Sequence, residues 1–229
     1  LHATIGASVG GLLALVLATQ YPDRVKNVIP ISAGLETTPL QFLHNFEQTV
    51  AILDDPDFRG GDYYDGPHPD RGLALARMIG HKTFVSLEAM ADRVRRGVVA
   101  AEDHPEGYEI THPLESYIWY QGQRFLERFD ANTYLRLMGM WQHFDLIEEV
   151  DPAVDDFVDL FERCAGQQYL VFSIDSDVCF YPDEQTRLMR VLQRAGVDAM
   201  RITVHSEKGH DSFLLEPGFF APHLQQILG

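Results

Sequence analysis

Thr4-Ile5-Gly6-Ala7-Ser8-Val9-Gly10-Gly11 is the stretch that decides the fold, because it reads as a strand, a sharp turn and a helix. Its centre has the pattern Gly-x-Ser-x-Gly, which is typical of a nucleophile elbow that presents a serine on a strained turn. We expect Gly6 and Gly10 to be required because strand and helix approach each other closely there. The apolar residues 12–18 predict a helix buried against a sheet. The competing interpretation is a glycine-rich turn with an incidental serine.

The rest of the chain predicts one α/β domain that is interrupted by helices. Short apolar runs at 27–32, 168–174 and 199–204 predict further parallel strands. Helical periodicity predicts helices at 39–53, 72–84, 87–99, 114–129, 132–140, 182–195 and 219–228, with polar loops at 54–70 and 102–111. No convincing strand lies between about 34 and 165. We therefore expect a sheet core formed by residues 1–34 and 166–229, with residues 35–165 as a helical lid inserted in it.

Composition excludes several classes of function. The 229 residues carry 18 basic and 34 acidic side chains, a net charge of −16, which disfavours binding to nucleic acid or to anionic membranes. No apolar run reaches the length of a membrane span. Cys164 and Cys179 are too few for a disulfide framework and lack zinc spacing, so we expect buried free thiols, a reducing cytoplasm and no metal site.

Three predicted strands end in residues that together support nucleophilic catalysis. Ser8 follows the first strand, Asp177 the third and His210 the fourth, and the order Ser, Asp, His is the one used by α/β-hydrolases. A serine needs an imidazole to take its proton and a carboxylate to orient that imidazole. Asp175 and His205 are the alternatives for the acid and the base; we favour Asp177, and we favour His210 because Gly209 precedes it in a loop.

The oxyanion of the reaction needs two backbone donors. One should be the amide of Val9, directly after the nucleophile. The chain begins at Leu1, immediately before the elbow strand, so we expect the strands on one side of the sheet, and with them the second donor, to be missing from it.

Several motifs along the chain resemble those of one family, the homoserine O-acyltransferases of the α/β-hydrolase fold. They are Gly6-Ala7-Ser8-Val9-Gly10-Gly11, Gly60-Gly61-Asp62-Tyr63-Tyr64, the run from Gly72 to His81, Tyr120-Gln121-Gly122, the run from Arg128 to Leu135, Ser176-Asp177 with Tyr181-Pro182, and the run from Gly209 to Leu214. The resemblance implies the α/β-hydrolase fold with a large helical lid.

The resemblance also implies a reaction. Ser8 would take an acetyl or succinyl group from acetyl-CoA or succinyl-CoA and pass it to the hydroxyl of L-homoserine, a step of methionine biosynthesis, with His210 as base and acid and Asp177 orienting it. Arg77 would bind the carboxylate of homoserine and Asp211 its ammonium group. Acyl-CoA would be a co-substrate, with no cofactor. The lid helices between about 37 and 129 would pair two subunits in a homodimer.

The chain departs from the family pattern at three points. Val9 and Ala7 replace a methionine and a glycine of the usual elbow, and Phe84 stands where the family commonly has a tyrosine that helps bind homoserine. The third departure is the missing amino-terminal part. The alternatives are therefore an esterase, an acyltransferase for another acceptor such as serine or deacetylcephalosporin C, and a catalytically incomplete fragment that acts as an interaction subunit.

Overall fold

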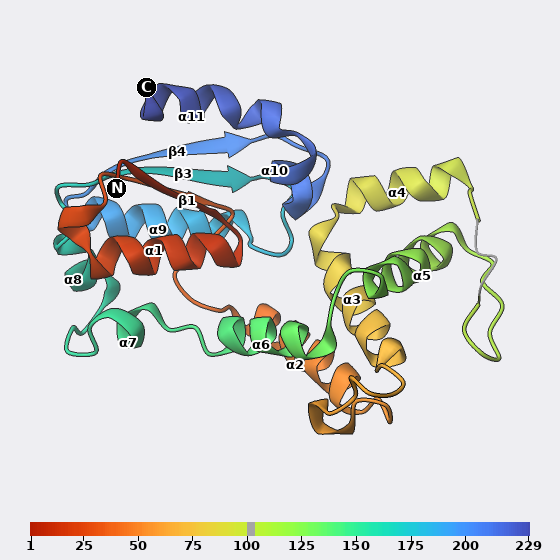
Figure 1. Cartoon of the computed structure of the whole chain (residues 1–229). Coiled ribbons are helices and arrows are strands. Elements are labelled where there is room, and N and C mark those ends of the chain that lie inside the picture. The colour runs from red at the N-terminus through yellow and green to blue at the C-terminus, as the bar shows by residue number, and fades with distance from the viewer. Residues whose placement is uncertain (100–103) are drawn as a thin grey trace. The chain divides into compact units, whose positions relative to one another are not determined.

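The chain forms two compact units in the computed structural model, which describes residues 1–99 and 104–229 (Figure 1). The sheet unit consists of residues 1–37 and 144–229, and the helical unit of residues 38–143. The predicted loop at 102–111 falls partly on residues outside the described ranges.

The sheet unit contains four parallel strands in the order β1-β2-β3-β4. The strands are β1 (Ala3–Ala7), β2 (Asn27–Ile31), β3 (Gln168–Ile174) and β4 (Asp198–Val204). Ala7 lies opposite Ile31, Ile31 opposite Phe172, and Ile174 opposite Val204. Because all four strands run the same way, the segments that follow them leave from one edge of the sheet.

Helices cover both faces of this sheet (Figure 1). On one face, α1 (Val9–Gln20) and α9 (Pro182–Arg194) pack Leu15 and Leu188 against Val28 and Val171. On the other, Phe220 and α11 (Ala221–Leu228) pack against Ile29, Leu170 and Phe172. Neighbouring positions such as 28 and 29, or 170 and 171, therefore serve opposite faces, which explains why the strands read as continuous apolar runs.

Two short helices that the sequence had placed in the insertion belong to the sheet unit. These are α7 (Leu146–Val150) and α8 (Phe157–Glu162), and Leu146, Leu160 and Phe161 are fully buried in its core. The second boundary of the helical unit therefore lies near residue 143 and not near 165. The signals for both helices are their capping residues, because the carboxylates of Asp145 and Asp156 accept bonds from first-turn amides.

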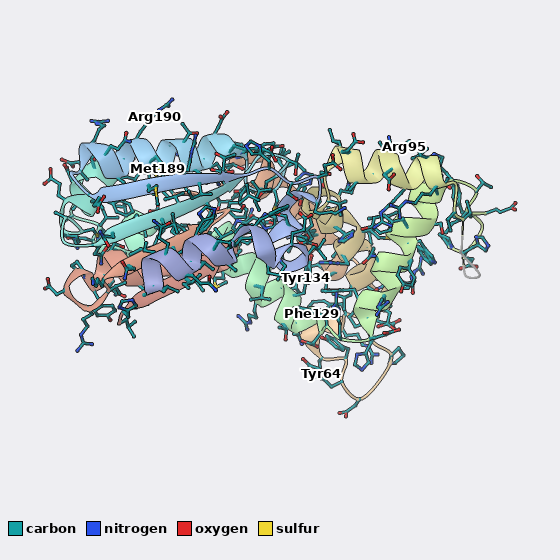
Figure 2. All side chains as sticks on the ribbon, turned by 90° about the horizontal axis from the view of Figure 1, so that it is seen from above. Tyr64, Arg95, Phe129, Tyr134, Met189 and Arg190 are labelled. Atoms are coloured by element: carbon teal, nitrogen blue, oxygen red, sulfur yellow. The ribbon has the colours of Figure 1, made fainter. Side chains whose placement is uncertain are left out.

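The helical unit contains α2 (Pro39–Leu53), α3 (Asp70–Phe84), α4 (Leu87–Arg96), α5 (Pro113–Leu126) and α6 (Ala131–Gln142). A capping box of Thr38 and Gln41 starts α2, and the side chain of Asp130 caps α6. Phe129 and Tyr134 meet edge to face, with ring centroids 5.8 Å apart (Figure 2). Among the described residues from 35 to 165, extended pairing is limited to one isolated bridge between Glu36 and Asp145, as expected for a helical insertion.

The remaining regular segments are short. They are the 3₁₀ turns Pro22–Arg24, Arg59–Gly61, Gly209–Asp211 and Pro217–Phe219, and helix α10 (Ser212–Leu215).

Candidate active site

Ser8 occupies the sharp turn between β1 and α1. Its backbone has φ 56° and ψ −130°, a conformation that non-glycine residues rarely adopt. The amide of Ser8 donates to the carbonyl of Ile31 on the neighbouring strand at 2.9 Å, and the carbonyl of Ser8 accepts from the amide of Gly11 at 2.8 Å. The sheet and the helix therefore hold the strained residue from both sides, as in a nucleophile elbow.

The small residues that the elbow requires are Gly6 and Gly11. A Cβ at Gly6 would lie 1.9 Å from the carbonyl oxygen of Gly10, and one at Gly11 would lie 2.5 Å from the Cβ of Ala33. A Cβ at Gly10 would meet no described atom within 4 Å. The expectation that Gly10 itself must lack a side chain was wrong, because its backbone, and not its Cα hydrogens, faces the strand.

Asp177 and His210 form a buried pair. The Nδ1 atom of His210 lies 2.7 Å from Oδ2 of Asp177, and their side chains are 3% and 0% exposed. Since a carboxylate only accepts, Nδ1 carries the proton, and Nε2 is the ring atom suited to take a proton from a serine. The other carboxylate oxygen accepts from the amides of Cys179 at 2.8 Å and Phe180 at 2.9 Å.

Aromatic rings hold the imidazole of His210 in its plane. The ring of Phe180 stacks on it with centroids 5.5 Å apart, and Phe213 of α10 meets it edge-on at 5.4 Å. Together with the hydrogen bond to Asp177, these contacts leave the imidazole little freedom to rotate.

The two alternative residues pair with each other. Nδ1 of His205 lies 2.8 Å from Oδ2 of Asp175, but this pair is open to solvent, with side chains 82% and 43% exposed. Ser176, between the two aspartates, donates to the carbonyl of Ser206 at 2.5 Å and accepts from the amide of Gly209 at 3.1 Å. These bonds fasten the loop that carries His210 to the turn that carries Asp177.

The proposed catalytic residues all leave the same edge of one sheet. Ser8 follows β1, Asp177 follows β3 and His210 follows β4, and Val9 is the first residue of α1. The first amides of a helix have no acceptor within it, so the N–H of Val9 is suited to donate a hydrogen bond to an oxyanion. Asp211 comes directly after His210 and is half-buried.

Arg77 lies in the helical unit, on α3, and is half-buried. Its guanidinium carbon lies 5.2 Å from the ring centre of Phe84 and 4.8 Å from that of Phe125. Nη2 of Arg77 lies 3.1 Å from Nδ1 of His81. Arg77 is therefore held by aromatic and polar neighbours of its own unit and does not extend freely into solvent.

Two titratable residues, one half-buried and one buried, escaped the sequence analysis. Glu184, in the first turn of α9, accepts from the amide of Tyr181 at 3.1 Å, and its Oε2 atom is buried with no hydrogen-bond partner among the described residues. His81 is only 5% exposed. The position of Glu184 three residues into a helix that starts at Tyr181-Pro182 was its available signal, whereas nothing in the local sequence marks His81 as buried.

The described residues contain no group of three or more His, Cys, Asp or Glu side chains arranged to hold a metal ion. Cys164 and Cys179 are buried free thiols, as the sequence predicted. Among the helices described, none combines the length and the apolar character needed to cross a membrane.

Comparison with known proteins shows the family of the chain. The sequence pattern of the alpha/beta hydrolase fold matches residues 1–192. The chain belongs to the alpha/beta hydrolase family. Within it, the chain is 39% identical over 217 residues to a homoserine O-acetyltransferase of Desulfotalea psychrophila. The matched region covers 94% of this chain and 54% of that protein. It is 38% identical over 223 residues to a homoserine O-succinyltransferase of Nitrosomonas eutropha, covering 95% and 57%.

Solved structures share this fold at low sequence identity. A homoserine O-acetyltransferase from Bacillus anthracis superposes with a TM-score of 0.86 at 19% identity, covering 100% of this chain and 60% of that one. Esterase E22 gives a TM-score of 0.84 at 19% identity, with 100% and 61% covered. The chain thus spans between half and two thirds of the length of these relatives.

Proposed function

We propose that this chain carries the acyl-transfer centre of a homoserine O-acyltransferase. The observation that carries the proposal is the buried Asp177–His210 pair at the sheet edge from which the strained Ser8 also leaves. The similarity to named homoserine O-acetyl- and O-succinyltransferases over 94–95% of the chain supports the choice of acceptor.

In the first half-reaction, Ser8 attacks the thioester carbonyl of acetyl-CoA or succinyl-CoA. His210 takes the proton of the Ser8 hydroxyl through Nε2, and Asp177 stabilises the imidazolium that forms. The oxyanion accepts a hydrogen bond from the N–H of Val9. When the carbon–sulfur bond breaks, His210 returns the proton to the CoA thiolate, and the acyl group remains on Ser8.

In the second half-reaction, the hydroxyl of homoserine attacks the acyl-serine ester. His210 takes the proton of that hydroxyl and returns it to the oxygen of Ser8 as the ester bond breaks. The acyl group leaves as O-acylhomoserine. This chemistry assigns no step to a metal or a cofactor, and acyl-CoA is consumed as a co-substrate.

For the acceptor, we assign the carboxylate of homoserine to Arg77 and its ammonium group to Asp211. A guanidinium offers a planar fork of donors that matches a carboxylate, and a carboxylate is the natural partner for an ammonium. Relatives named for acetyl and for succinyl transfer are similar to the chain at 39% and 38%, so the donor is assigned as acetyl-CoA or succinyl-CoA. We place the reaction in the cytoplasm, in keeping with the two free cysteines.

Phe84 favours a second candidate function, in which the acyl group is transferred to an acceptor other than homoserine or to water. Its ring contacts Arg77 but offers no hydroxyl to an amino-acid substrate. An esterase or an acyltransferase for serine would use the same Ser8, Asp177 and His210.

The first test follows CoA release from acetyl-CoA and succinyl-CoA by the full-length protein, with homoserine, with serine and with neither. We expect homoserine to accelerate release, and Ser8→Ala to remove both the acyl-enzyme seen by mass spectrometry and at least about 10³-fold of the rate. Arg77→Lys should raise the KM for homoserine, because an ammonium cannot reproduce the fork. Arg71→Lys, exposed on the same helix, is its control. CoA release that ignores every acceptor would support the esterase instead.

A further inference from the structure

His81 stands out among the buried polar residues because it bridges two side chains of the helical unit. It lies on α3, four residues after Arg77, and therefore on the same face of the helix. Its Nδ1 atom is 3.1 Å from Nη2 of Arg77, and its Nε2 atom is 2.6 Å from the hydroxyl of Tyr117 on α5. Both ring nitrogens thus have a defined partner, which simple packing of a histidine would not require.

The chemistry of the partners determines where the proton of His81 lies. A guanidinium can only donate, so Nδ1 must accept from Arg77 and must be unprotonated. Nε2 then carries the proton and donates to the oxygen of Tyr117. Burial, followed by the charges of Arg77 and Arg93, lowers the pKa of His81 to about 4, which keeps the ring neutral at physiological pH.

The surroundings of this group restrict the guanidinium further. The rings of Phe84 and Phe125 lie within 5.2 Å of the guanidinium carbon. Tyr117 is itself covered by Arg93, whose guanidinium carbon lies 3.7 Å from the ring centre. The chain of contacts from Arg93 through Tyr117 and His81 therefore ends on the Arg77 side chain.

A neutral histidine differs from a carboxylate in its effect on an arginine. A carboxylate would orient Arg77 but also neutralise its charge, whereas neutral His81 orients it without adding a negative charge. The bond to His81 therefore fixes the direction of the guanidinium and leaves its charge unchanged.

We propose that His81 is a positioning residue that holds the Arg77 guanidinium, through its neutral Nε2–H tautomer, in the orientation that receives the carboxylate of the acceptor substrate. The proposal rests on the proposed function for the identity of that substrate, but the tautomer and the orienting bond are properties of the chain alone. Tyr117 supports His81 by accepting the hydrogen bond from its Nε2–H.

Two substitutions separate an orienting role from packing. In His81→Asn the amide oxygen can occupy the place of Nδ1 and accept from Arg77, whereas in His81→Gln the amide lies near the place of Nε2 and serves Tyr117 instead. We expect His81→Gln to raise the KM for homoserine roughly 10- to 100-fold, the usual effect of losing a hydrogen bond to a charged group. His81→Asn should stay within about threefold of wild type.

The acyl-enzyme half-reaction, measured without homoserine, should be the same in both variants, because it does not use Arg77. Lys82→Gln, exposed at the next position, is the control and should change neither step. Equal losses in His81→Asn and His81→Gln, or equal slowing of both half-reactions, would show that His81 only packs.

A spectroscopic measurement keeps the proposal testable if homoserine is not the acceptor. Two-bond ¹H–¹⁵N spectra of the wild-type protein distinguish the two neutral tautomers of a histidine, and we expect His81 to be Nε2–H and unchanged from pH 8 down to about pH 5.5. An Nδ1–H tautomer, or titration near the ordinary histidine pKa of about 6.5, would overturn the proposal. Failure of homoserine to stimulate CoA release would count against the proposed function only.

Discussion

At the scale of single residues, Glu184 is the group whose burial has the clearest consequence for stability. Its Oε2 atom faces Gly34. A Cβ at Gly34 would lie 2.4 Å from that oxygen, so the carboxyl occupies space that a side chain at residue 34 would need. Burial raises the pKa of Glu184 from 4.5 to about 8. The hydrogen bond from the amide of Tyr181 acts to lower this pKa, and the nearby charge of Asp177 acts to raise it. At neutral pH this carboxyl is therefore mostly protonated.

This raised pKa predicts how stability depends on pH. The unfolded chain loses the proton of Glu184 near pH 4.5 and the folded chain near pH 8, so the stability present below pH 4.5 is lost as pH rises to about 8. Glu184→Gln removes this loss. We expect the variant to match wild type in its free energy of unfolding near pH 4.5 and to exceed it by on the order of 3 kcal/mol at pH 9.

Urea denaturation at both pH values checks the prediction. Asp183→Asn, exposed in the same turn of α9, is the matched control and should show no such difference. A Glu184→Gln variant that is no more stable than wild type at pH 9 would show that the carboxyl is ionised at little cost in the folded protein.

The elbow glycines give a second prediction at this scale. Gly6→Ala places a methyl 1.9 Å from the backbone oxygen of Gly10, so strand and helix must move apart. We expect it to lower the free energy of unfolding by about 3 kcal/mol or more. Gly10→Ala is the matched control, since its methyl meets no described atom and alanine is favoured over glycine in a helix. Thermal unfolding of both variants decides the matter: similar Tm values would mean that the elbow tolerates a side chain at residue 6.

At the scale of elements, the sequence predicted the positions of the strands and long helices well. The helix predicted at 39–53 has those bounds in the structure, because Thr38, Pro39 and Gln41 mark its start and its apolar positions follow one helical face. The strand at 168–174 also has the predicted bounds, and the strands predicted at 27–32 and 199–204 each differ by one residue at one end. Short helices such as α7 and α8 were missed because five or six residues do not establish a period.

The same limit applies to the site. The positions of Ser8, Asp177 and His210 after three strands were predictable, because strand ends are visible in sequence. Sequence reasoning favoured the pairing of Asp177 with His210 without excluding Asp175 and His205. It did not predict that Asp175 and His205 pair with each other, because each His–Asp pair joins residues 30 or more positions apart. His81 lay beyond sequence reasoning, since its partner Tyr117 comes from another helix 36 residues away.

At the scale of the whole molecule, the helical unit presents an apolar surface that suggests contact with a second copy of the chain. Phe42, Phe46 and Leu53 on α2 are 50–58% exposed. A cavity of about 980 Å³ opens between α2, α3 and α5, and its apolar lining includes Phe46, Leu75 and Trp119. Large exposed aromatic and aliphatic side chains beside a hollow are typical of protein interfaces.

We therefore predict a homodimer that uses residues between about 37 and 129. A two-fold interface places the same surface of both subunits face to face, so one substitution acts twice. Phe46→Glu should place two charges in the contact and convert the dimer to a monomer, with the mass measured by light scattering halved. Met200→Glu, at a similarly exposed position on β4 of the sheet unit, is the control and should leave the mass unchanged. A monomeric mass for wild type, or a dimer that persists in Phe46→Glu, would exclude this surface as the interface. If Phe46→Glu is monomeric and circular dichroism shows no loss of helical content, the interface includes α2.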